Sequence, residues 1–129
     1  MTEKIWVRDA YDWLNKSLLP VPCELNELDW KNDLSPNKER VIEHLIAFGN
    51  YPGGGCMVFG VNNNGDMQGV DEKRCTEILG TLASLSRDGI EPPIALDHEV
   101  SNRFDMPILF VRIPEQTVKP VHRRGKSIE

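Results

Sequence analysis

Three consecutive glycines, Gly53–Gly55, separate a helix-like segment from an apolar run, and this order limits what the chain can fold into. The preceding segment ends at Phe48–Asn50 with helical spacing, and Gly55–Val61 is apolar almost throughout, as in a buried strand. A phosphate-binding loop has the reverse order, because its glycines follow a strand, carry a Lys-Ser/Thr pair and lead into a helix N-terminus. Here no such pair follows, and the nearest helix end is a C-terminus, which repels anions. The glycine run therefore predicts a tight corner into a sheet and argues against a nucleotide site.

The length and charge of the chain restrict its class. Its 129 residues, 40% of them hydrophobic, fit a single domain with one core. The net charge of −5 argues against strong nonspecific binding of nucleic acid, which depends on clustered Lys and Arg, and leaves a local basic patch as the route. No apolar run approaches the roughly 18 residues of a membrane span, so we expect a cytoplasmic protein with no membrane partner.

The cysteines Cys23, Cys56 and Cys75 are far apart and lack the spacing of a zinc site. Their odd number also argues against a disulfide framework. We therefore expect free thiols in a reducing compartment. The histidines are equally isolated from one another in the sequence, so we expect structural or surface roles for them: His44, His98 and His122.

Hydrophobic periodicity and turn residues divide the chain into helices and strands. Ser35 followed by Pro36 is typical of a helix start, and Asp71 is suited to cap a further helix. Asn64–Gly65 predicts a hairpin turn in which both residues have positive φ. We expect an α+β (mixed α/β) domain, with helices packed on a central mixed, largely antiparallel sheet of about five strands. The helices are expected over residues 5–18, 36–50 and 72–89, and the strands over 25–31, 55–61, 67–70, 94–100 and 108–113.

The first expected helix has an apolar face rich in aromatic side chains, including Trp6, Tyr11 and Trp13. Such a face packs either on its own domain or on another subunit. The sequence therefore leaves open a protein-interaction module, with a homo-oligomer formed through this helix. We assign residues 1–22 to the helix and its linker and residues 23–129 to the main domain, whose C-terminal end we expect to be truncated.

Acidic residues gather around the first expected strand. Glu27, Asp29 and Lys31 share one face, whereas Glu24 would join them only through a bend or bulge. Clustered carboxylates of this kind can hold Mg²⁺ or Mn²⁺ for phosphodiester chemistry. The alternative is a solvated strand face with one Asp–Lys pair.

Basic residues gather near the C-terminus, between Lys119 and Lys126. The guanidinium groups of Arg123 and Arg124 suit phosphate oxygens, which they can bind with two hydrogen bonds each. Such a patch can hold a nucleic-acid backbone without reading its sequence. The alternative is a solvated tail.

Three segments taken together match the pattern of a known family. The first, Glu24–Lys31, reads Glu-x4-Asp-Trp-Lys where the family has Glu-x4-Glu-Phe-Lys. The second, from Ala47 to Val70, contains Ala-Phe-Gly-Asn, the glycine run, Gly-Val-Asn-Asn-Asn-Gly and Gly-Val. The third pairs Ile113–Pro114 with Lys119–Val121. These segments resemble the Schlafen-type AlbA_2 family, whose domains are described as DNA-binding.

This resemblance implies a mixed α/β fold and a noncatalytic regulatory domain whose partner is DNA or RNA. Asn50 is suited to cap a helix end, since Asn tolerates the left-handed conformation, and most of the motif would specify the fold, with ligand contact as the alternative. The phosphate contacts implied are Lys31, Arg123, Arg124 and Lys126. The motif residues are Asn50, Gly53, Gly54, Gly60, Asn62, Gly65 and Gly69.

The resemblance also implies an alternative, because Schlafen relatives include endoribonucleases that use three acidic residues and a divalent metal. The first two acidic positions fall on Glu24 and Asp29, which would be the catalytic and metal-binding residues. The third falls on Asn62 or Asn63, and an amide binds a hard cation more weakly than a carboxylate. We therefore expect no cofactor and no cleavage, with Mg²⁺ or Mn²⁺ needed only if the domain is a nuclease.

Overall fold

The computed structural model describes residues 4–18, 27–102 and 105–125. Its described helices are α1 (Ile5–Leu18), α2 (Lys38–Asn50) and α3 (Glu72–Gly89). Its described strands are β1 (Leu28–Lys31), β2 (Gly55–Phe59), β3 (Ile90–Glu91), β4 (Asp97–Ser101), β5 (Ile108–Ile113) and β6 (His122–Arg123).

Four of these strands form one mixed sheet in the order β1-β2-β5-β4. β1 is parallel to β2, and the other two pairings are antiparallel, so the mixed and largely antiparallel sheet expected from the sequence is confirmed. The two remaining strands, β3 and β6, pair antiparallel in a small separate sheet that the sequence did not predict.

β1 and β2 are shorter than expected, since β1 begins at Leu28 and β2 ends at Phe59, and two further expected strands differ more. Residues 67–70 form no strand, and Met67 makes only a single bridge to Val61, because Gln68 and Gly69 both donate to the Gly60 carbonyl and the chain folds back on that one acceptor. β4 begins at Asp97 and not at residue 94, since Ser86 of α3 binds both backbone polar groups of Ile94.

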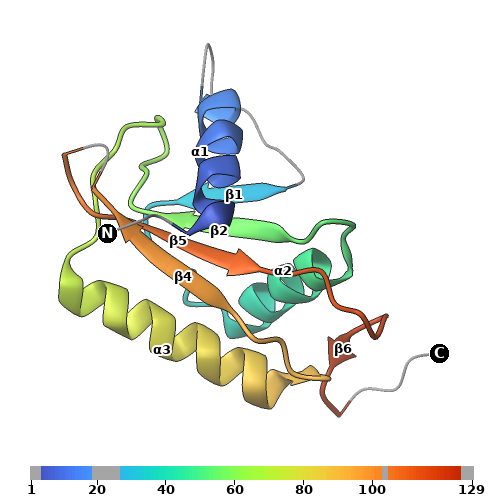
Figure 1. The fold of residues 1–129 in the computed structure, drawn as a ribbon. Helices are drawn as coiled ribbons and strands as arrows, with labels where there is room; N and C mark the ends of the chain where they lie inside the picture. Colours follow the sequence, from blue (N-terminus) through green and yellow to red (C-terminus); the bar gives the residue numbers. More distant parts are fainter. Residues whose placement is uncertain (1–3, 19–26, 103–104, 126–129) are drawn as a thin grey trace.

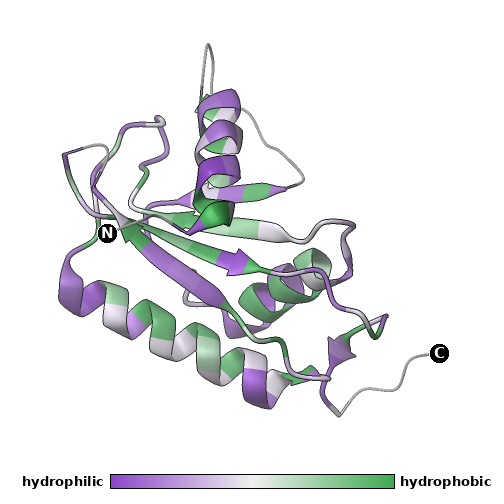
Figure 2. Cartoon of the chain, in the orientation of Figure 1, coloured by the Kyte–Doolittle hydropathy of each residue, from purple (hydrophilic) through white to green (hydrophobic). Residues whose placement is uncertain are grey.

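Helices cover both faces of the main sheet, with α1 on one side and α2 and α3 on the other (Figure 1). The alternation of a strand directs successive side chains to these two layers. In β2, Met57 and Phe59 join the cluster formed with α2 and α3, whereas Cys56 and Val58 join the cluster beneath α1. All four are fully buried, which explains why β2 reads as a continuous apolar run. Figure 2 shows hydrophobic colour along the two central strands, β2 and β5, and mostly hydrophilic colour along the edge strand β4.

The apolar face of α1 packs on its own sheet. Val7, Ala10 and Leu14 are fully buried, and the ring centroid of Tyr11 lies 5.0 Å from that of Phe110 in β5. At the far end of the helix, Trp30 Nε1 donates to Ser17 Oγ at 2.6 Å. Trp6 and Trp13 pack against the same cluster as Tyr11, so the side chains that motivated the oligomer hypothesis make contacts within the chain.

The start of α2 differs from the expectation. Asn37 is the N-cap, and its side-chain oxygen accepts from Arg40 N at 3.2 Å. Ser35 and Pro36 lie before the cap, because Ser35 Oγ accepts from Asn37 N and holds the turn that precedes the helix. The predicted cap of α3 is confirmed, since Asp71 Oδ1 accepts from Arg74 N at 2.8 Å.

The turn between β2 and α3 is built around one side chain. Asn62 Oδ1 accepts from the backbone N–H groups of Asn64 and Asp66, and Gly65 N donates to the Asn62 carbonyl. Gly65 has a φ of 86°, but Asn64 stays outside the left-handed region, so the expected turn with two positive φ angles was wrong. The Asn62 amide selects a different turn by binding the backbone on its inner side.

Candidate nucleic-acid interface

The corner after α2 is fixed by Asn50, the last residue of that helix. Its amide nitrogen donates to the Val121 carbonyl at 3.1 Å, and its amide oxygen accepts from Val121 N at 2.8 Å. Asn50 remains helical and does not adopt the left-handed conformation that its residue type tolerates. The side chain instead imitates a strand partner and ties the segment before β6 to the end of α2.

Gly54 makes the closest backbone approach in this corner. Its φ is 72°, and a Cβ atom there would lie 2.3 Å from the Ile113 carbonyl oxygen and 2.7 Å from Glu115 N. No other residue type fits this position without moving backbone. The motif glycines Gly60 and Gly69 meet in a similar way, since a Cβ on Gly60 would lie 3.1 Å from Gly69 backbone. These contacts explain the glycine pattern as a requirement of the fold.

Arg112 of β5 forms hydrogen bonds to backbone carbonyls of the glycine corner. Its Nη2 donates to the Gly53 carbonyl at 2.7 Å and its Nη1 to the Gly55 carbonyl at 3.3 Å. Gly53 N donates to Glu115 Oε1 at 2.9 Å. Arg112 was not among the predicted site residues, although a cation inside an otherwise apolar strand is a visible signal. Because protein groups bind both its carbonyls and an N–H, the corner is not arranged as a phosphate cradle.

Asp29 lies on the face of β1 toward α2, as the alternation of the strand predicted. Its Oδ2 is 2.9 Å from Lys31 Nζ, an ionic contact, and 3.5 Å from His44 Nδ1, and neither contact has hydrogen-bond geometry. The side chains of these three residues are one-fifth to one-third exposed. The Asp–Lys pair weighed from the sequence is therefore present, and Lys31 has a carboxylate partner before any phosphate arrives.

Two of the residues at the acidic positions of the family's nucleases, Asp29 and Asn62, already have protein partners in the described structure. Glu24 lies outside the described residues. Asn62 Oδ1 is committed to the turn, where it accepts two backbone N–H groups, and Asp29 has Lys31 beside it. Across residues 4–18, 27–102 and 105–125, no three His, Cys, Asp or Glu side chains are grouped so that they could hold a metal ion.

Arg123 and Arg124 lie at the C-terminal end of α3, where the unpaired carbonyls of a helix attract cations. Arg123 Nη1 and Arg124 N both donate to the Gly89 carbonyl, at 3.1 and 2.8 Å. Arg123 also binds Glu39 of α2 through two hydrogen bonds, at 2.8 and 3.0 Å. Arg123 is therefore a structural bridge between α2, α3 and β6.

The guanidinium of Arg124 makes fewer hydrogen bonds within the described residues than that of Arg123. Among the described residues its guanidinium makes one hydrogen bond, 3.5 Å long, to the Arg87 carbonyl. The side chain of Arg87 is 70% exposed and paired with the adjacent Asp88. Of the predicted phosphate contacts, Lys31 belongs to the main sheet and is thus separated from Arg123 and Arg124 at the end of α3. Lys126 lies outside the described residues.

The described cysteines, Cys56 and Cys75, are free and buried, and Cys23 lies outside the described residues. Burial raises the pKa of Cys56 to about 12, which keeps this thiol protonated and unreactive. Of the histidines, His44 touches Asp29, while His98 lies in β4 and His122 in β6.

Solved structures share this three-layer arrangement. The solution structure of the N-terminal domain of a protein from Nitrosomonas europaea, named as related to the ATP-dependent DNA helicase RecG, superposes with a TM-score of 0.64 at 22% identity and covers 92% of this chain and 82% of that one. The crystal structure of the DIP2311 protein from Corynebacterium diphtheriae gives a TM-score of 0.52 at 14% identity, covering 92% of this chain and 23% of that one. No curated protein matches the chain.

The architecture defines an α+β domain with a mixed sheet between two helical layers. The sequence model of the Schlafen AlbA_2 family matches residues 24–129, and the chain belongs to this family. Within the described residues, no helix has both the length and the apolar character that a membrane crossing requires.

Proposed function

We propose that this domain binds nucleic acid, DNA or RNA, as a regulatory module that does not cleave it. Membership of the AlbA_2 family is the observation that carries the proposal. The similarity to a domain of a DNA-helicase-related protein agrees with it. The residues at the acidic positions support binding without cleavage, because Asp29 is paired with Lys31 and Asn62 holds its own turn.

The end of α3 is the surface we assign to the backbone phosphates. Arg124 has the guanidinium with the fewest protein contacts of the predicted set, and Arg87 lies beside it. Lys126, which was predicted with these arginines, lies outside the described residues. Arg123 would hold the adjacent backbone in position through its hydrogen bonds to Glu39 and to the Gly89 carbonyl, without itself binding phosphate.

The experiment measures binding of labelled single- and double-stranded DNA and RNA by fluorescence anisotropy at several salt concentrations. We expect dissociation constants that rise steeply with salt, and a salt slope that falls by about one unit in Arg124→Ala. Arg8→Ala is the matched control, because it removes the same charge from an exposed position on α1, across the sheet. Binding weaker than about 100 μM to all four probes at low salt, or an equal loss in Arg8→Ala, would contradict the proposal.

A further inference from the structure

β4 forms one edge of the main sheet, so one side of its backbone faces away from β5. His98 N donates to Asp97 Oδ1 at 2.8 Å, and the His98 carbonyl accepts from Lys4 Nζ at 2.8 Å. Successive residues of an antiparallel ladder direct their backbone groups to opposite sides. Val100 therefore presents its N–H and carbonyl on the same outer side as His98, where an edge strand can pair with another strand.

A shallow hollow lies beside this edge, between β4 and α3. Val100 is 40% exposed, which is a large exposure for an aliphatic side chain in a strand. The hollow offers apolar surface to any side chain that projects from a strand placed next to β4. Its floor and walls include Val70, Cys75, Leu79, His98, Val100 and Pro107.

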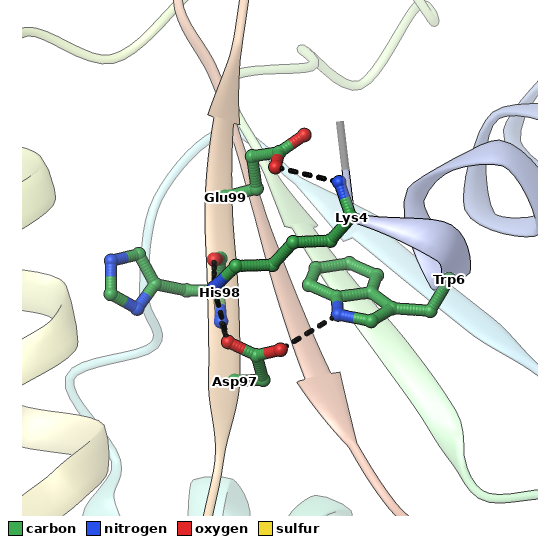
Figure 3. A network of polar contacts seen from close by, with 5 residues as sticks. All are labelled: Lys4, Trp6, Asp97, His98 and Glu99. Carbon is green, nitrogen blue, oxygen red and sulfur yellow. Dashed lines mark hydrogen bonds and ion pairs between the residues drawn. The ribbon is translucent and has the colours of Figure 1, made fainter. Parts of the chain in front are cut away.

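The opposite face of β4 carries two carboxylates, and Lys4 occupies both. Lys4 Nζ lies 2.5 Å from Asp97 Oδ1, and Lys4 N donates to Glu99 Oε1 at 3.1 Å. Trp6 Nε1 donates to Asp97 Oδ2 at 2.9 Å. Figure 3 shows the Lys4 side chain reaching across β4 to Asp97 and the His98 carbonyl. This segment precedes α1 in the chain and thus brings a basic group to the edge of a strand more than ninety residues later.

We propose that the outer edge of β4 binds an extended peptide in which basic and apolar residues alternate, and that Lys4 occupies the basic position within the free chain. An added strand directs alternate side chains to opposite faces. Its basic residues would meet Asp97 and Glu99, and its apolar residues would enter the hollow beside Val100. A second copy fits poorly, because antiparallel pairing of two β4 strands sets the carboxylates of one copy against those of the other.

The test uses the full chain and a fluorescent peptide of alternating Lys and Val, measured by anisotropy. Lys4→Ala frees Asp97 and the His98 carbonyl, which the Lys4 side chain binds, whereas Glu99 accepts from the backbone N–H of residue 4 and keeps that bond. We therefore expect about fivefold tighter binding than in the unchanged protein, the effect of one exposed ion pair. Adding Asp97→Asn to Lys4→Ala should reverse the gain, because it removes the charge that Lys4→Ala frees. Lys38→Ala, which removes an exposed Lys of α2, is the matched control and should leave the affinity unchanged.

Two further peptides keep the test independent of how the variants fold. A peptide with an N-methyl group on every backbone nitrogen keeps the side chains but has no backbone N–H to donate to a strand, and a Glu-Val peptide inverts the charge. We expect neither to bind the unchanged protein. Equal binding of the N-methylated peptide, or equal affinity in the unchanged protein and Lys4→Ala, would overturn the proposal. Dimerisation of Lys4→Ala without peptide would assign the edge to a second copy and overturn it as well.

Discussion

Asn50 and Val121 are joined by two hydrogen bonds in opposite directions, from the end of α2 to the segment before β6. The asparagine side chain thus forms the pair of backbone hydrogen bonds that a neighbouring strand would form, between segments 71 residues apart. Because Val121 is buried at 1% exposure, its backbone groups have no ready access to water when this partner is removed.

Asn50→Ala is therefore expected to lower the free energy of unfolding by about 2 kcal/mol, the cost of leaving buried backbone groups unpaired. Urea denaturation followed by circular dichroism measures the change. Asn63→Ala is the control, since Asn63 is an exposed loop residue. Equal stability of the two variants would show that water replaces the amide at Val121.

Three glycines test whether the corner is steric. Gly54→Ala places a Cβ atom 2.3 Å from the Ile113 carbonyl oxygen and should cost at least about 3 kcal/mol. Gly53→Ala has open space around its Cβ but a φ of 86°, so about 1 kcal/mol is expected. Gly80→Ala, in the exposed middle of α3, should stabilise the protein by about 0.5–1 kcal/mol. Thermal unfolding of the three variants gives the order, and a different order would disprove the steric explanation.

Substitutions of Arg123 and Arg124 should have opposite patterns of effect on stability and on nucleic-acid binding. Arg123→Ala removes two hydrogen bonds to Glu39 and one to Gly89, so it should lower the midpoint of denaturation. Arg124→Ala should leave that midpoint nearly unchanged while weakening nucleic-acid binding. Parallel denaturation and anisotropy measurements on both variants decide this. A stable Arg123→Ala protein with weakened binding would assign Arg123 to the phosphates instead.

Asp97 makes a pH-dependent contribution to stability. Burial raises the pKa of this carboxyl, but hydrogen bonds from Lys4, Trp6 and His98 outweigh that effect and hold the pKa below its ordinary value of about 4. The ionised form is favoured in the folded state, so the contribution is complete above about pH 4 and disappears as the pH falls through the lowered pKa. Denaturation midpoints of the unchanged protein and Asp97→Asn should therefore differ at pH 7 and converge toward pH 2. A constant difference across that range would contradict this prediction.

Metal-dependent cleavage is not expected. Incubation with structured RNA and Mn²⁺ or Mg²⁺ should leave the RNA intact, because Asp29 is paired with Lys31 and Asn62 Oδ1 accepts two backbone N–H groups. Gel electrophoresis of the products measures this. Cleavage that is lost in Asp29→Asn would restore the nuclease hypothesis, whereas cleavage that persists in this variant would indicate a contaminant.

The sequence predicted the elements whose signals are local. The apolar run of β2, the Asp71 cap and the glycine corner each depend on neighbours within a few residues, and each is present in the structure. The start of α2 was misplaced because Ser35 and Asn37 are both good caps, and the sequence alone does not rank them.

The candidate site was less predictable because its contacts join distant segments. Arg123 reads as a phosphate ligand in a basic run, but its carboxylate partner, Glu39, is 84 residues away. The partners of Arg112 are also distant in the sequence, because they are the carbonyls of Gly53 and Gly55. The two-residue strands β3 and β6 carry too few residues to show any periodicity.

α1 has a practical consequence for anyone who divides this protein by homology. The family match begins at residue 24, after the helix that buries Leu28, Val58 and Phe110. A fragment trimmed to that boundary would expose the apolar face of the sheet to water, and we expect it to aggregate. Soluble expression and crystallisation trials should therefore retain the helix together with Lys4, and a poorly behaved trimmed fragment would say nothing about the behaviour of the intact fold.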